Sequence, residues 1–140
     1  MAMYSNGKLV DSSLVFSEGQ TLPNSGTSVN STNAVFFGGA QSGKLVVNVA
    51  ASTNISIAVG QGLTIKIEYG TTSTPTSVLN DTIYSHTASG SPDAWAAGDL
   101  ICQYTIPADK AATYSYAELV YTTTASEAGE KLDAWVSIVT

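Results

Sequence analysis

Short runs of alternating apolar and polar side chains follow one another along this 140-residue chain, from about residue 45 to residue 139. The clearest run is 63–69, where apolar and polar residues take turns: Leu63, Ile65, Ile67 and Tyr69 against Thr64, Lys66 and Glu68. Successive side chains of a strand point to opposite faces, so this period of two predicts strands with one buried and one wet side. Helix-period patterning is nearly absent, and the chain is therefore expected to be all-β.

Turn-forming residues divide the pattern into about eight strands. We expect strands at 44–50, 63–69, 78–87, 99–106, 114–122 and 132–138, with weaker candidates at 9–16 and 29–37. A chain of this length is one domain by the usual prior, and strands at this spacing predict a single jelly-roll-type β-sandwich. One short helical turn is expected near 92–97, because Ser91 can cap it, Pro92 suits its first position and Gly98 can end it.

The first part of the chain differs from the rest. We expect residues 1–28 to form an extended N-terminal arm and residues 29–140 to form the sandwich, because Gly, Pro and Asn residues, Gly19 among them, interrupt the first segment. Three apolar residues of this arm, Leu14, Val15 and Phe16, are unfavourable in water. We therefore predict that the arm reaches onto a neighbouring subunit; a frayed terminus is the alternative.

Residue types that carry out chemistry are scarce. The chain has one histidine, one cysteine, no arginine and 11% charged residues, against roughly 25% in an ordinary soluble domain. His86 is not accompanied by a nucleophile elbow, and Cys102 shares a strand face with apolar residues, so an inert thiol is expected. Zinc needs three or four His or Cys ligands, and no EF-hand calcium loop is present. We predict no enzymatic activity, no catalytic residues, no cofactor and no metal.

Glycoside hydrolysis needs two carboxylates that face each other across a cleft. Glu68 and Glu118 lie on expected strands, both on faces expected to be wet, and nothing in the sequence marks them as a pair. The segment 38–44 superficially resembles a phosphate loop, but its spacing is wrong and a strand follows it where a helix is needed. Neither feature changes the prediction that the protein acts by contact.

Charge and hydropathy restrict the partners. The net charge is −6 and the five lysines are scattered, which argues against a nucleic-acid surface. No run approaches the roughly 18 apolar residues of a membrane span, so we expect no membrane partner. The start of the chain lacks the basic and then apolar pattern of a secretory signal, and a single cysteine cannot form an internal disulfide. These features favour assembly or a reducing cytosol.

Three aromatic residues stand on the faces opposite to the apolar rows of their strands. They are Tyr114, Tyr116 and Trp135. A large aromatic side chain on such a face indicates a contact surface. With Leu14, Val15 and Phe16, these residues are our predicted protein interface. The alternative is that loops cover both sheet faces, and aromatic platforms also bind sugars.

The order of segments resembles that of a known family. The resemblance rests on Asp11–Ser17 before a Gly/Ser/Thr stretch, Ser31–Val35, the strand 45–49, Gly62–Gly70 running into a Ser/Thr loop, Ala97–Leu100 before a strand ending at Ile106-Pro107, and 114–121. The chain is similar in these segments to the jelly-roll cement, or decoration, proteins of tailed-phage heads, such as that of a Bordetella podophage. These are strand and turn patterns without a chemical signature, from about Leu9 onward.

The resemblance implies a non-enzymatic structural protein made in the host cytoplasm and located on the virion, at the outer surface of the capsid. Its partners would be the major capsid protein, bound where subunits meet, and further copies of itself as a dimer or trimer. The alternative is a carbohydrate-binding jelly roll, a lectin-like adhesin module. That alternative predicts a pocket with an aromatic floor and converging Asn or Asp groups. A pilin-type subunit is a third possibility.

Overall fold

The computed structural model describes residues 2–5, 8–11, 14–23, 26–37, 44–76, 79–124 and 129–139, the first two ranges by their backbone only. Its strands are β1 (Ala2–Ser5), β2 (Lys8–Asp11), β3 (Val15–Thr21), β4 (Thr27–Asn30), β5 (Val35–Phe36), β6 (Lys44–Ala51), β7 (Ile55–Ile57), β8 (Gly62–Gly70), β9 (Asn80–Thr87), β10 (Asp93–Trp95), β11 (Leu100–Thr105), β12 (Tyr116–Thr123) and β13 (Lys131–Val139). One short helix, α1 (Ala108–Thr113), is present in the described residues. The segment 38–43, most of the loop compared with a phosphate loop, lies outside the described residues.

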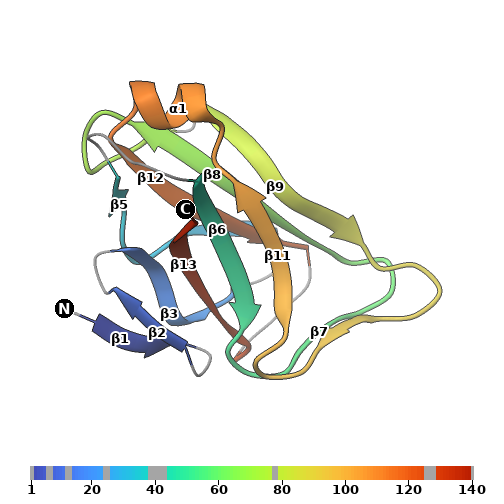
Figure 1. The fold of residues 1–140 in the computed structure, drawn as a ribbon. Coiled ribbons are helices and arrows are strands. Elements are labelled where there is room, and N and C mark those ends of the chain that lie inside the picture. The colour runs from blue at the N-terminus through green and yellow to red at the C-terminus, as the bar shows by residue number, and fades with distance from the viewer. Residues whose placement is uncertain are drawn as a thin grey trace.

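Two antiparallel sheets form a sandwich (Figure 1). One sheet has the strand order β11-β6-β13-β3, and the other has the order β4-β12-β8-β9, with β5 also paired to β12. Two further strand pairs, β1 with β2 and β7 with β10, lie outside these sheets. The predicted all-β sandwich is confirmed.

The strand pairing is nested in the manner of a folded-over hairpin. Of the eight main strands, the first pairs with the last (β3 with β13), the second with the seventh (β4 with β12), the third with the sixth (β6 with β11) and the fourth with the fifth (β8 with β9). This order is the double-sheet jelly roll. Residues from both ends of the chain therefore meet in one sheet.

The core lies between the two sheets, and the alternation in the sequence builds it. Leu63, Ile65 and Ile67 of β8 are fully buried, whereas Thr64 and Lys66 between them are not. From the facing sheet, β6 and β13 contribute Val47, Val49, Leu132 and Ala134. Full burial of a Leu, Ile or Val side chain stabilises the fold by roughly 1.5–3 kcal/mol, so these rows supply much of the free energy of folding.

The boundary of the predicted arm differs in the structure. Residues 15–21, which we expected within the arm, form β3, an edge strand of the sandwich paired with β13. Gly19 has φ 57°, and its N–H donates a hydrogen bond of 2.7 Å to Oδ1 of Asp133. The register of β3 against β13 shifts around this point. A glycine with positive φ and a register shift are the marks of a β-bulge, so Gly19 bends the strand and does not end it.

The prediction of a helical turn near 92–97 was wrong. Asp93–Trp95 is strand β10 and pairs antiparallel with Ile55–Ile57. Gly98, at φ 94°, belongs to a turn in which the N–H of Asp99 donates to the carbonyl of Ala96 over 2.9 Å. The local signals for a helix end are also those of a tight turn, and strand pairing decided between them. The helix lies instead directly after Pro107.

Candidate functional site

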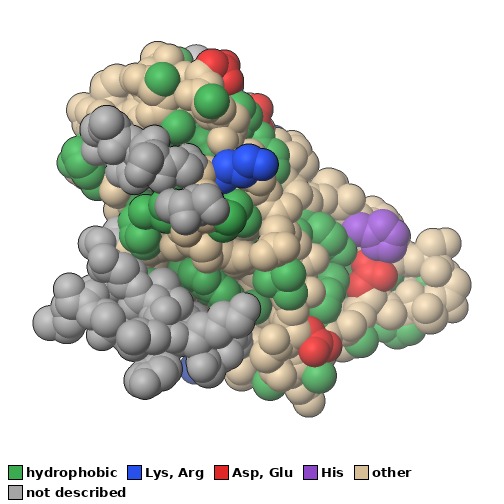
Figure 2. All heavy atoms as spheres, viewed as in Figure 1, with side chains coloured by type: hydrophobic (Ala, Val, Ile, Leu, Met, Phe, Trp, Pro, Cys, Tyr) green, Lys and Arg blue, Asp and Glu red, His purple; other side chains and the backbone are tan. Residues whose placement is uncertain are grey.

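An open groove lies where β9 faces β10, at the end of the sandwich that carries the β7 and β10 pair. Its volume is about 440 Å³, and six residues line it: Tyr84, Ser85, His86, Asp93, Ala94 and Trp95. Figure 2 shows the imidazole beside an acidic side chain at a hollow between the body of the molecule and its projecting end. The groove therefore combines aromatic surface with polar groups.

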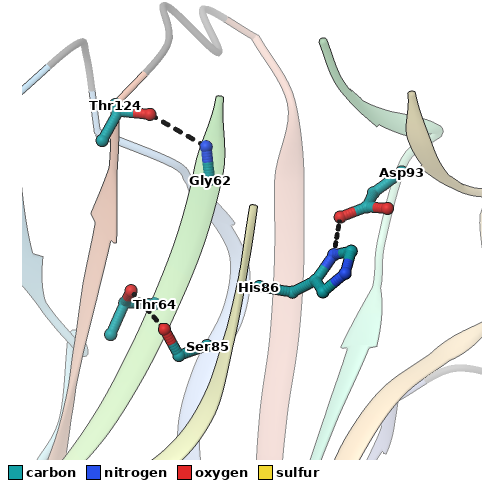
Figure 3. A network of polar contacts seen from close by, with 6 residues as sticks. All are labelled: Gly62, Thr64, Ser85, His86, Asp93 and Thr124. Atoms are coloured by element: carbon teal, nitrogen blue, oxygen red, sulfur yellow. Dashed lines mark hydrogen bonds and ion pairs between the residues drawn. The ribbon is translucent and has the colours of Figure 1, made fainter. Parts of the chain in front are cut away.

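Strand alternation decides which side chains enter the groove from β9. Tyr84 and His86 are two residues apart and pair by register with Ile65 and Leu63, whose side chains are in the core. Ser85 between them points the other way and shares a hydrogen bond of 3.2 Å with Oγ1 of Thr64 (Figure 3). The inner face of β9 thus supplies one aromatic ring and one imidazole.

The opposite wall comes from β10 by the same rule. Asp93 and Trp95 pair by register with Ile57 and Ile55, which are buried in the core, while Ala94 between them is exposed. The rings of Trp95 and Tyr84 meet edge to face, with centroids 6.1 Å apart. Burial raises the pKa of the Tyr84 phenol and the charge of Asp93 raises it further, so the phenol is neutral at physiological pH.

His86 and Asp93 join the two walls. Nδ1 of His86 lies 2.5 Å from Oδ2 of Asp93, and about half of the imidazole is exposed (Figure 3). A carboxylate on Nδ1 orients the ring, as in a catalytic triad. The serine of the groove, however, faces Thr64 on the other side of β9. The pair can orient or bind a polar ligand, and the lining residues give it no activated nucleophile.

Gly62 allows the two strands beneath the groove to approach closely. A Cβ atom at this position would lie 2.9 Å from the carbonyl oxygen of His86, closer than real Cβ contacts. The N–H of Gly62 also donates a hydrogen bond of 2.8 Å to Oγ1 of Thr124 on the far side (Figure 3). The glycine therefore helps to set the position of His86.

The three predicted interface residues of the N-terminal segment pack against other residues of the same chain. Phe16 is fully buried in the main core, and Leu14 packs against that core. Val15 forms a small separate cluster with Trp135 and Ala50. Trp135 lies on the sheet face opposite to Ala134, as expected, but only 5% of its surface is exposed. The contact that covers Trp135 is made within the chain.

The two predicted interface tyrosines are partly exposed. Tyr114 stacks on Tyr69, with ring centroids 5.9 Å apart. Tyr116 meets Phe36 edge to face at 5.0 Å, and Phe36 is 52% exposed. We did not single out Phe36 from the sequence, because it lies in the weak strand candidate 29–37, where alternation does not separate the faces. The structure thus brings Tyr116 together with an aromatic residue that no pattern in the sequence marks.

Glu68 and Glu118 are direct cross-strand partners on β8 and β12, each only 8% exposed. Burial raises the pKa of both carboxyls, and the charge of Glu68 raises that of Glu118 further, while Lys66 lowers that of Glu68. The amide of Asn30 donates a hydrogen bond of 3.0 Å to Oε1 of Glu118. The two carboxyls lie side by side on one sheet face, which differs from the facing pair of a glycoside hydrolase.

Among the described residues, no group of three or more His, Cys, Asp or Glu side chains could hold a metal ion. In the part of the chain that the structure describes, no helix is both long enough and apolar enough to span a membrane.

Comparisons of the chain with protein-family models, with curated proteins and with solved structures found no match.

Proposed function

We propose that this chain is a capsid cement protein of a tailed phage. In this proposal it binds the outer surface of the head between major capsid protein subunits and stabilises the shell, as a homo-oligomer. The resemblance described above supports this function. The nested jelly-roll pairing is consistent with it, because it runs from β3 to β13 and so includes most of the segments that carry the resemblance.

The observation that carries the proposal is the aromatic pair of Phe36 and Tyr116. Phe36 is 52% exposed, and its ring is 5.0 Å from that of Tyr116, on the side of β12 where β5 is the edge strand. Aromatic side chains are enriched in the cores of protein interfaces and dominate their binding energy. A phenylalanine held at a sheet edge in this way is suited to insert into a partner.

Two general properties fit attachment to a lattice. A net charge of −6 favours approach to a basic surface, and many copies on one shell gain avidity because neighbouring contacts act together. Exposed edge strands, which most proteins protect, can pair with a strand of a neighbour. None of these contacts requires a reacting group.

The test uses heads of the phage that encodes the chain, isolated without this protein. Purified chain is added, and bound copies are measured by cosedimentation and by electron microscopy of the particles. The double variant Phe36→Ser with Tyr116→Ser is expected to lose at least about tenfold in affinity, as for an interface hot spot. Val59→Ser is the matched control, because Val59 is also 52% exposed and lies in the turn between β7 and β8.

Three results decide the proposal. Saturable binding that the double variant loses and the Val59 control keeps supports both the function and the surface. Saturable binding by all variants supports the function and rejects the aromatic pair as its contact. Absence of the wild-type chain from repeated sites on the head overturns the function.

A further inference from the structure

We propose that the groove between β9 and β10 is a binding site for a neutral saccharide. This goes beyond a role in capsid stability and does not depend on it. The groove residues are far in sequence from the Phe36 and Tyr116 pair, and they belong to different strands. A protein on a particle surface can carry both.

The first argument is the composition of the walls. Tyr84 and Trp95 present aromatic surface, and the side chains of Asp93 and His86 lie beside them along the same groove. The hydroxyl groups of a sugar ring donate hydrogen bonds to a carboxylate, and its C–H faces pack on an aromatic ring. Small-molecule sites combine apolar walls with a few placed polar groups in this way.

The second argument is that the polar groups are already oriented. Oδ2 of Asp93 is held at 2.5 Å by Nδ1 of His86, and this contact crosses the groove from one wall to the other. The aromatic contact between Tyr84 and Trp95 also crosses it. A ligand therefore meets groups fixed by packing and hydrogen bonding, which lowers the entropic cost of binding.

The third argument, from charge, selects neutral sugars over acidic ones. The six lining residues include no lysine, the chain has no arginine, and the one basic group of the groove, His86, is bound to Asp93. A sialic or uronic acid would bring its carboxylate next to Asp93 without a cation to pair it. Unpaired like charges at close range disfavour binding, so the acidic sugar should be rejected.

The size and openness of the groove set the expected affinity. A volume of about 440 Å³ lies at the lower end of the roughly 300–1,000 Å³ of small-molecule sites and suits one or two sugar rings. The groove is shallow and wide open, closer to a flat surface than to an enclosed cavity, so much of the ligand stays in water. We expect dissociation constants near the millimolar range for one site, with stronger capture where several copies act together.

The experiment screens the whole purified chain on a glycan array that pairs each neutral glycan with its sialylated form. Each hit is then titrated by NMR, following the indole N–H signals of the two tryptophans, with lactose and 3′-sialyllactose as a defined pair in every series. Saturable binding of at least one neutral glycan, with the Trp95 indole shifted and the sialylated partner weaker, is the expected result. Binding of no neutral glycan, or preference for the acidic form, overturns the proposal.

Variants locate the binding site and separate binding from folding. Asp93→Asn keeps the size of the side chain and is expected to lower the affinity for the neutral glycan about tenfold, because a charged hydrogen bond acceptor is lost. Asp109→Asn makes the same change on exposed α1 and should leave affinity unchanged. Unchanged affinity of a folded Asp93→Asn protein, judged by its melting temperature, would reject the groove. Binding of Asp93→Asn to phage heads should remain normal, so this proposal and the capsid proposal fail separately.

Discussion

Tyr104 of β11 donates a hydrogen bond of 2.9 Å to Oδ2 of Asp81 on β9, and this bond joins edge strands of the two opposite sheets. Tyr69 of β8 donates to the same oxygen over 3.0 Å. One carboxylate thus accepts from two phenols at the end of the sandwich near α1. Burial raises the pKa of both phenols and the hydrogen bonds to Asp81 raise it further, so both remain donors at neutral pH.

Replacing Asp81 by Ala should destabilise the fold by about 2 kcal/mol, because Tyr69 is buried and loses its acceptor. Tyr104→Phe removes only one of the two bonds and should cost about 1 kcal/mol. Urea denaturation measures both values. A change below about 0.5 kcal/mol for Asp81→Ala would show that the network adds nothing to stability.

Trp135→Ala should reduce the free energy of unfolding by about 3 kcal/mol, because the side chain is 5% exposed and packs with Val15 and Ala50. Tyr116→Ala, at a half-buried site, should cost much less stability and should weaken partner binding instead. Thermal melting and head binding are measured on both proteins. If Trp135→Ala melts normally but no longer attaches to heads, Trp135 contributes to the interface and not to stability.

Glu118→Gln should stabilise the protein at neutral pH by about 0.5 kcal/mol, because it removes one of two like charges paired across β8 and β12. The folded pKa of this carboxyl is raised, so the folded state binds protons more tightly than the unfolded chain. Stability therefore falls as pH rises from the ordinary value of 4.5 through the raised one, and the penalty is complete above it. Below pH 4 the variant and the wild type should be equally stable.

Denaturation curves between about pH 3 and pH 8 check this prediction. Glu18→Gln, on an exposed position of β3, is the matched control and should follow the wild type at every pH. A Glu118→Gln protein less stable than wild type at pH 7 would mean that the carboxylate makes a contact worth more than the repulsion.

Cys102 should be nearly unreactive in the folded protein. Burial raises the pKa of its thiol to about 12, and the thiolate is the reactive form. Ellman's reagent at pH 8 should label the native protein far more slowly than free cysteine and should label one thiol rapidly in 8 M urea. Equal rates in both states would show that the side chain is accessible.

Removal of residues 1–13 should leave a folded sandwich, whereas removal of residues 1–16 should destabilise it severely. The longer deletion takes away Val15 and the fully buried Phe16 from β3, and loss of a core phenylalanine alone costs about 3–5 kcal/mol. Circular dichroism and urea denaturation distinguish the two proteins. The shorter deletion is therefore the one that tests, by head binding, whether the predicted arm contributes to attachment.

Local alternation was sufficient to predict the class of fold and most of the strands. Residues 63–69, 116–123 and 131–139 alternate clearly, and their inner rows are the core. Alternation did not predict which apolar residues at the strand ends are exposed. Leu100 and Ile138 continue apolar rows, yet both are exposed, and the register of β11 against β6 shifts directly after Leu100. Periodicity gives the face of a residue and does not say whether anything lies opposite.

The amino-acid sequence by itself determined that this protein is built of strands, has a dry and a wet face on each, and is poor in reactive side chains, since these follow from residue type and spacing. Only the tertiary structure decided that β3 belongs to the sandwich, that Asp93–Trp95 is a strand, and that His86 meets Asp93. Each of these depends on pairing between segments separated along the chain, and neither propensity nor local turn chemistry encodes which segments pair. The groove and the aromatic pair both arise from such pairing.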